Sequence, residues 1–85
     1  MIEIQIRVLY FGQARELSGT LEEFLSLPSP LYLDQAFSAI VRAHPQLEGI
    51  RHSLSVLVNG RSVADKIELK DGDRVALMPP VAGGS

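Results

Sequence analysis

The stretch of sequence that decides the fold is residues 2–11, IEIQIRVLYF, in which apolar and polar side chains alternate. Successive side chains of a β-strand point to opposite faces, so this period of two indicates a strand with one face on a core. We expect Leu9 and Phe11 to point away from that core. The expected core-facing side chains are Ile2, Ile4, Ile6, Val8 and Tyr10.

The next segments predict a short helix and a second strand. Gly12 interrupts the alternation, and residues 13–18 (QARELS) favour a short helix. Residues 21–27 (LEEFLSL) can form a hairpin partner of the first strand. The register of this partner stays open in the sequence. The side chains available to the core are Leu21, either Phe24 or Leu25, and Leu27.

Residues 33–44 have the spacing of an amphipathic helix of about three turns. Asp34 near the start suits the helix dipole, and Pro45 just past the end cannot continue the helix. The residues that recur on one face are Leu33, Ala36, Phe37, Ile40, Val41 and His44.

The C-terminal third predicts a short hairpin and a last strand. The dipeptide Asn59-Gly60 readily adopts the positive φ angles of a tight turn. Strands are expected on both sides of this turn, over residues 54–58 and 61–64, and again over residues 74–78. Pro79-Pro80 ends the last strand, because proline cannot donate to a sheet ladder.

This order of elements predicts an α+β fold, a mixed sheet with one main helix packed across one face. In such a fold the first and last strands can lie side by side in the middle of the sheet, which is the β-grasp or ubiquitin-like topology. We therefore expect a β-grasp domain over residues 1–80 and a flexible C-terminal tail over residues 81–85.

The composition narrows the classes of function. Eight basic and ten acidic residues give a net charge of -2, and the basic residues are scattered, which disfavours a nucleic-acid partner. The absence of cysteine from the sequence excludes disulfides, thiolate metal ligands and a catalytic thiol, and it suits a reducing compartment. No targeting or membrane-spanning segment is visible, so we expect a cytoplasmic protein without a membrane partner.

The side chains give little support to an enzyme that works alone. Glu22 and Glu23 are adjacent and would point to opposite faces of a strand, so we expect them to be solvated surface residues. His44 and His52 have no partners at a ligand spacing, and we expect them to be structural or exposed. No serine or threonine stands in the context of a catalytic triad. We expect no metal site and no bound cofactor.

The end of the chain, PPVAGG at residues 79–84, has a more specific pattern. Six residues can reach about 20 Å from the domain. Pro79-Pro80 restricts the exit direction, while Gly83-Gly84 has no side chain to block a narrow channel. This shape suits delivery of a terminal carboxylate into the active site of another protein, after a partner has activated that carboxylate with ATP.

Several motifs together resemble the MoaD family, the small sulfur-carrier subunits of molybdopterin synthase. The resemblance covers nearly the whole chain and is most specific at its two ends. The motifs are LYFGQAREL at residues 9–17, Ser18-Gly19, Asn59-Gly60, DGDRVA at residues 71–76 and PPVAGG at residues 79–84.

The resemblance implies a sulfur-transfer cycle in molybdenum cofactor biosynthesis. An adenylating enzyme of the ubiquitin-activating type would use ATP to activate the Gly84 carboxylate, and a sulfur donor protein would convert it to a thiocarboxylate. The large subunit would then take the sulfur to form the dithiolene of molybdopterin, in a heterotetramer of two small and two large subunits. This chain would be the non-catalytic subunit, because it supplies the sulfur atom and no catalytic side chain.

Strand parity adds a hypothesis about docking. If the first and last strands are parallel neighbours, Leu9, Phe11, Ala76 and Met78 cluster away from the core near the root of the tail. We expect Phe11 and Met78 to dock the large subunit and Arg15 to contact one of the partners. The further residues expected to bind a partner are Pro79, Pro80, Val81 and Ala82.

Other functions fit the same features. A carrier for thiazole synthesis or tRNA thiolation shares the fold and the terminal Gly-Gly, and a protein modifier would use the same tail and activation chemistry. A non-catalytic interaction module would use the sheet surface alone. Ser85 departs from the family pattern, because the resemblance places the terminal carboxylate on Gly84. We expect a chain ending in Ser85 to be activated poorly.

Overall fold

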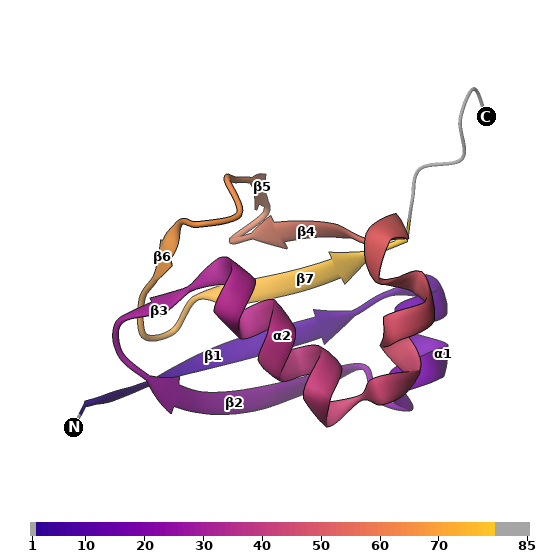
Figure 1. The fold of residues 1–85 in the computed structure, drawn as a ribbon, viewed down its shortest axis with the longest axis horizontal. Helices are drawn as coiled ribbons and strands as arrows, with labels where there is room; N and C mark the ends of the chain where they lie inside the picture. The colour runs from indigo at the N-terminus through magenta and orange to yellow at the C-terminus, as the bar shows by residue number, and fades with distance from the viewer. Residues whose placement is uncertain (1, 80–85) are drawn as a thin grey trace.

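The computed structural model describes residues 2–79 and shows a mixed sheet with one main helix, α2, across one face (Figure 1). The sheet has five strands in the order β2-β1-β7-β4-β5. In chain order these strands are β1 (Glu3–Tyr10), β2 (Glu22–Pro28), β4 (Ser55–Val58), β5 (Arg61–Ser62) and β7 (Arg74–Met78). β1 and β7 are parallel neighbours, with Val8 opposite Val75, and all other pairs in this sheet are antiparallel. This is the expected β-grasp topology.

Strand β1 has the predicted alternation, with one exception. The core contains Ile4, which is 8% exposed, and the fully covered side chains of Ile6, Val8 and Tyr10. Ile2 is 75% exposed, so its expected place in the core is wrong. The ladder between β1 and β2 begins with the pair Glu3 and Pro28, and Ile2 lies beyond this pair, outside the cover of the core side chains.

The two predicted helices are present. Helix α1 (Gly12–Ser18) ends at Gly19, whose φ of 75° gives the left-handed conformation common just past a helix. Helix α2 (Leu33–Ala43) has Asp34 in its first turn and is followed by His44. The side chains that α2 buries are Leu33, Ala36, Ile40 and Val41, and Phe37 packs at the margin of the core.

The register of β2 selects one of the alternatives that the sequence leaves open. Leu25 lies opposite Ile6 on β1, and Leu27 lies opposite Ile4, so both pack against the core. Leu21 and Phe24 are 53% and 57% exposed, and neither belongs to the core. The expectation that Leu21 is buried is therefore wrong, and the choice between Phe24 and Leu25 falls on Leu25.

The C-terminal hairpin forms as predicted, with Asn59 at a φ of 52° and Gly60 at a φ of 80°. Its second strand, β5, is shorter than expected. Two further elements have no counterpart in the sequence-based prediction. The segment Pro45–Ser53 forms a 3₁₀ helix, η1, that buries Leu47 completely. A small second sheet pairs β3 (Leu31–Tyr32) with β6 (Glu68–Leu69).

No helix within residues 2–79 is long and apolar enough to cross a membrane.

Candidate functional site

The ends of β1 and β7 carry four apolar side chains on the face of the sheet opposite α2. Leu9 pairs with Ala76 across the parallel ladder. The Phe11 N–H donates to the Leu77 carbonyl at 3.1 Å, which extends the ladder and places Phe11 beside Met78. Phe11 is 38% exposed, and the other three side chains are partly exposed. Leu9, Phe11, Ala76 and Met78, here named the apolar patch, gather as strand parity predicts.

A fifth apolar residue, Leu57 on β4, extends the apolar patch and is missed by the sequence analysis. Leu57 pairs with Ala76 across the antiparallel ladder between β4 and β7 and is partly exposed. The signal for it lies in the Asn59-Gly60 turn. A two-residue turn pairs Val58 with Arg61, and the burial of Val58 then sends Leu57 to the opposite face.

The root of the C-terminal segment lies against the start of α1. β7 ends at Met78, and Pro79 lies against Gly12, the first residue of α1. Met78 and Pro79 also line an open depression of about 480 Å³ beside β4, together with Leu54 and Val56. The predicted site residues that follow lie outside the described residues: Pro80, Val81, Ala82, Gly83 and Gly84.

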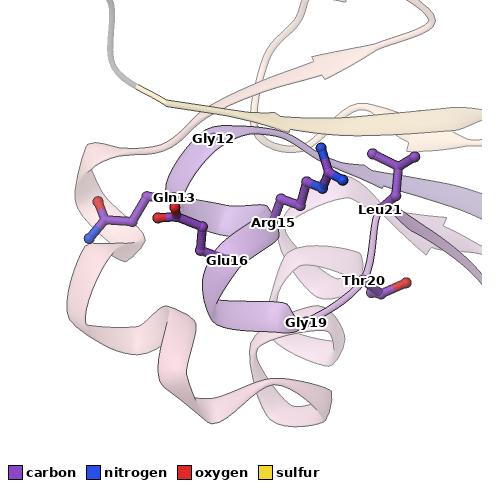
Figure 2. A pocket seen from close by; sticks show the side chains of 7 residues that line it. All are labelled: Gly12, Gln13, Arg15, Glu16, Gly19, Thr20 and Leu21. Atoms are coloured by element: carbon purple, nitrogen blue, oxygen red, sulfur yellow. The ribbon is translucent and has the colours of Figure 1, made fainter.

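Arg15 lies on α1, outside the apolar patch. It borders an open hollow of about 680 Å³, and its side chain extends from α1 toward Leu21 (Figure 2). Gln13 and Glu16 lie on the other side of the same hollow. No ion pair within residues 2–79 involves the Arg15 guanidinium. Arg15 is thus exposed on α1, three residues after Gly12, the residue that Pro79 contacts.

Charged side chains border the apolar patch along the sheet. Arg7 on β1 donates to a Glu22 carboxylate oxygen from Nε at 2.8 Å and from Nη2 at 2.6 Å. Arg74 on β7 pairs with Arg7 across the parallel ladder, and it is exposed. Beside the apolar patch, this surface therefore carries Arg7, whose charge is neutralised by Glu22, and the exposed Arg74. An apolar centre with a charged border is typical of a protein-binding face.

Glu23 belongs to a half-buried cluster, and its expected place among the solvated surface residues is wrong. Its carboxylate accepts a hydrogen bond from the Tyr10 hydroxyl, and His44 Nε2 lies 2.8 Å from the same oxygen. The rings of Tyr10 and His44 meet edge to face. Burial, and then the hydrogen bond to Glu23, raise the pKa of Tyr10 well above its ordinary value. The cluster joins β1 and β2 to the end of α2.

This cluster confirms the expected structural role of His44, and His52 is exposed as expected. Within residues 2–79, no group of three or more histidine and carboxylate side chains is close enough to hold a metal ion. What the described residues present is a surface and an exit point: an apolar patch beside the place where the chain leaves the sheet.

Comparison with known proteins agrees with this arrangement. The sequence matches the ThiS family over residues 8–84. It is 37% identical to the molybdopterin synthase sulfur carrier subunit of Chlamydomonas reinhardtii over 95% of this chain and 100% of that protein. The human protein of the same name is 31% identical, over 94% of each chain.

Solved structures give the same result. The putative molybdopterin converting factor subunit 1 of Pyrococcus furiosus superposes with a TM-score of 0.86 at 31% identity, over 92% of this chain and 99% of that one. The Haloferax volcanii small archaeal modifier protein 1 gives 0.84 at 28% identity, over 92% and 99%.

A third structure is a complex of subunits 1 and 2 of the Helicobacter pylori molybdopterin-converting factor. Its matching chain has a TM-score of 0.67 and 26% identity, over 95% of this chain and 100% of that one. The chain therefore belongs to the ThiS family and is related over nearly its whole length to molybdopterin synthase sulfur carrier subunits.

Proposed function

We propose that this protein is a sulfur carrier that bears a thiocarboxylate on Gly84 and delivers sulfur to the large subunit of molybdopterin synthase, for dithiolene formation in molybdenum cofactor biosynthesis. The observation that supports this most is the position of the chain exit. β7 lies in the middle of the sheet and ends at Met78, inside the apolar patch, so that the described part of the chain ends, at Pro79, beside this patch.

The proposed chemistry takes place on the C-terminal carboxylate. The carboxylate of Gly84 attacks the α-phosphate of ATP on an adenylating partner, and pyrophosphate leaves. Sulfur in the oxidation state of hydrosulfide, supplied by a donor protein, then displaces AMP from the acyl group, and a thiocarboxylate results. After the sulfur has passed to the pterin substrate, water restores the carboxylate. The adenylating partner uses the ATP, and the carrier itself needs no bound cofactor.

The described residues would serve this cycle by docking. Phe11 and Met78 would offer the apolar contact area for the large subunit, and Arg15 would offer a cation on the neighbouring helix α1. Pro79 and Pro80 would direct the chain outward. Val81 and Ala82 would then line the entry to the partner's site, and Gly83-Gly84 would pass into it. The complex of subunits 1 and 2 from Helicobacter pylori supports a large-subunit partner.

A second candidate function is protein modification. The likeness to small archaeal modifier protein 1 favours it, since that protein has the same fold over 99% of its length. A modifier would use the same activated Gly84 carboxylate but transfer it to a lysine amine, which gives a stable amide. Carriers for thiazole synthesis or tRNA thiolation would differ from the first proposal only in the acceptor of the sulfur.

Intact-mass spectrometry tests these proposals. A chain that ends at Gly84 is incubated with the adenylating enzyme, ATP and a sulfur donor. The carrier function predicts a product about 16 Da heavier, because sulfur replaces one oxygen. A chain that ends at Ser85 is the matched control and should stay at its starting mass. Stable conjugates on a denaturing gel without this mass shift would favour the modifier. The absence of both the heavier product and the conjugates would contradict both functions.

A further inference from the structure

Strand β2 forms one edge of the five-stranded sheet, and its outer side is open (Figure 1). The Tyr10 N–H donates to the Leu21 carbonyl at 2.9 Å, and the Ser29 N–H donates to the Ile2 carbonyl at 2.9 Å. Backbone groups along an antiparallel strand alternate in direction, so the odd-numbered residues from 21 to 29 bond to β1. The N–H and C=O groups of Phe24 and Ser26 therefore point away from the sheet.

The two edges of the sheet are protected unequally. β5, the opposite edge, has only two residues and begins with the charged Arg61. β2 has seven residues, and the side chain of Phe24 in its middle is 57% exposed. Long edges with free backbone groups pair readily with another strand, and proteins usually shorten them or place charges on them. The middle of β2 has neither kind of protection.

A groove runs between the end of β2 and α2. Leu27 and Leu31 line its apolar floor with Ala39, and its volume is about 250 Å³. Arg42 stands at the border of this groove, and its side chain is exposed. None of the ion pairs and side-chain hydrogen bonds within residues 2–79 involves Arg42. The groove thus combines an open strand edge, an apolar floor and one cation without a partner.

We propose that the β2 edge binds an extended peptide segment of a partner protein, in which alternate residues are apolar and a carboxylate follows them. The segment would add to the sheet as a further strand, with main-chain hydrogen bonds to Phe24 and Ser26. Every second side chain would then face α2, where Leu27 and Ala39 receive apolar groups. The carboxylate would pair with Arg42.

Charge favours this occupant over a second copy of the chain. Antiparallel pairing of two β2 edges about Leu25 would place the α2 helices of both copies along one seam. Each helix would bring an Arg42 without a recorded partner to that seam. The carboxylate that this pairing sets opposite Leu27, Glu23 of the other copy, is already bonded to Tyr10 and His44 and would not neutralise it. An acidic peptide instead supplies the charge that the groove lacks.

The β2 edge is separate from the site proposed for sulfur transfer. β1 lies between β2 and β7, and the C-terminal segment leaves from the end of β7. A peptide on β2 can therefore bind while the apolar patch holds another partner. This inference does not depend on the sulfur-carrier function, and deletion of Gly83-Gly84 should leave peptide binding unchanged.

Backbone NMR with a synthetic probe tests the proposal. The probe is the acetylated and amidated peptide GSVTVTDEG, and the expected result is saturable shifts of the Phe24 and Ser26 amides with a Kd below about 1 mM. The control peptide GSVPVPDEG has prolines in place of the threonines and should not bind, because a proline-interrupted strand cannot pair along the edge.

A charge reversal identifies the groove. The substitution Arg42→Glu should weaken binding of GSVTVTDEG by about tenfold. The variant chain should instead bind the peptide GSVTVTKKG, whose lysines complement the new carboxylate. Arg61→Glu on the β5 edge is the matched control and should bind GSVTVTDEG as the unchanged chain does.

Three outcomes would overturn the proposal. The first is the absence of saturable shifts on β2, and the second is equal binding by Arg42→Glu. The third is a set of β2 shifts that appears with protein concentration alone, with a dimer in sedimentation, since this would assign the edge to a second copy.

Discussion

Gly12 and Pro79 are in such close contact that a Cβ atom on Gly12 would lie 3.0 Å from Cγ of Pro79. Gly12 also has a φ of +55°, which side chains rarely permit. The start of α1 and the last described residue of the chain are thereby fitted to each other. The position of Pro79, after which residues 80–85 follow in the sequence, therefore depends on its contact with Gly12.

Gly12→Val should destabilise the protein by about 3 kcal/mol, because it combines a positive φ at a β-branched residue with a clash against Pro79. Urea unfolding measures this change. Gly19→Ala separates the two causes, since Gly19 has a φ of +75° but nothing within 4 Å of its Cβ position, and it should cost about 1 kcal/mol. Gly49→Val has open space and should cost less than Gly12→Val. Equal losses of unfolding free energy for Gly12→Val and Gly49→Val would contradict the claim that Pro79 and the positive φ constrain Gly12.

Phe11→Arg should weaken binding of the large synthase subunit at least thirtyfold, about 2 kcal/mol, because it places a charge in the apolar patch. Isothermal titration calorimetry with the purified large subunit gives the Kd. Ile67→Arg is the matched control, since Ile67 is also 38% exposed but lies next to β6, away from the patch. The docking role of the patch is wrong if both variants bind as the unchanged chain does.

The hydrogen bond from Tyr10 to Glu23 should make stability fall in alkaline solution. The pKa of Tyr10 is raised in the fold, so the folded chain keeps the phenol proton while the unfolded chain loses it above about pH 10. The contribution of the protonated Tyr10 to the free energy of unfolding is fully present below that pH. It is lost as the pH rises, by up to about 1.4 kcal/mol per pH unit.

The variant Tyr10→Phe measures this contribution. It should be less stable than the unchanged chain by about 1 kcal/mol near pH 8, and this difference should shrink or reverse by about pH 11. Both chains carry Tyr32→Phe, so that ultraviolet absorbance reports Tyr10 alone in the chain that keeps this tyrosine. A difference that stays constant over this range would show that the proton on Tyr10 is not linked to folding.

Asn59 holds the hairpin to β7 through its side chain. Its Nδ2 donates to Asp73 Oδ1 at 3.0 Å, and its Oδ1 accepts from the Arg74 N–H at 2.9 Å. Asn59→Gly keeps the positive φ but loses both bonds and should cost about 1–2 kcal/mol in urea unfolding. Asn59→Ala should cost about 1 kcal/mol more, because it also strains the backbone. If the two variants are equally stable, the φ at this position contributes nothing.

Periodicity accounts for the parts of the fold that the sequence predicts. β1 and α2 each repeat their apolar residues at the period of the element, and the β7 pattern ends at two prolines, so these elements and the apolar patch follow from short-range reasoning. Ile2 shows the limit of that reasoning. Its place in the alternation is correct, but burial depends on whether a neighbouring element extends far enough to cover it.

The features that were missed depend on contacts between distant parts of the chain. Leu31 pairs with Leu69 in a ladder of two residues on each side, which is too short to leave a pattern. η1 has a single fully buried residue, Leu47, in a segment that reads as a polar loop. Glu23 meets Tyr10 and His44 only after three elements have packed together, so the adjacent pair Glu22-Glu23 suggests solvated side chains when the sequence is read alone.

The central place of β7 gives the chain a mechanical property. A partner that draws on the residues beyond Pro79 pulls along the axis of a strand that is bonded to β1 on one side and to β4 on the other. Such a load acts on both ladders in shear, so that many hydrogen bonds resist it together and none is peeled away singly. The fold should therefore stay intact under such a load, as the proposed delivery of the C-terminus to successive partners would require.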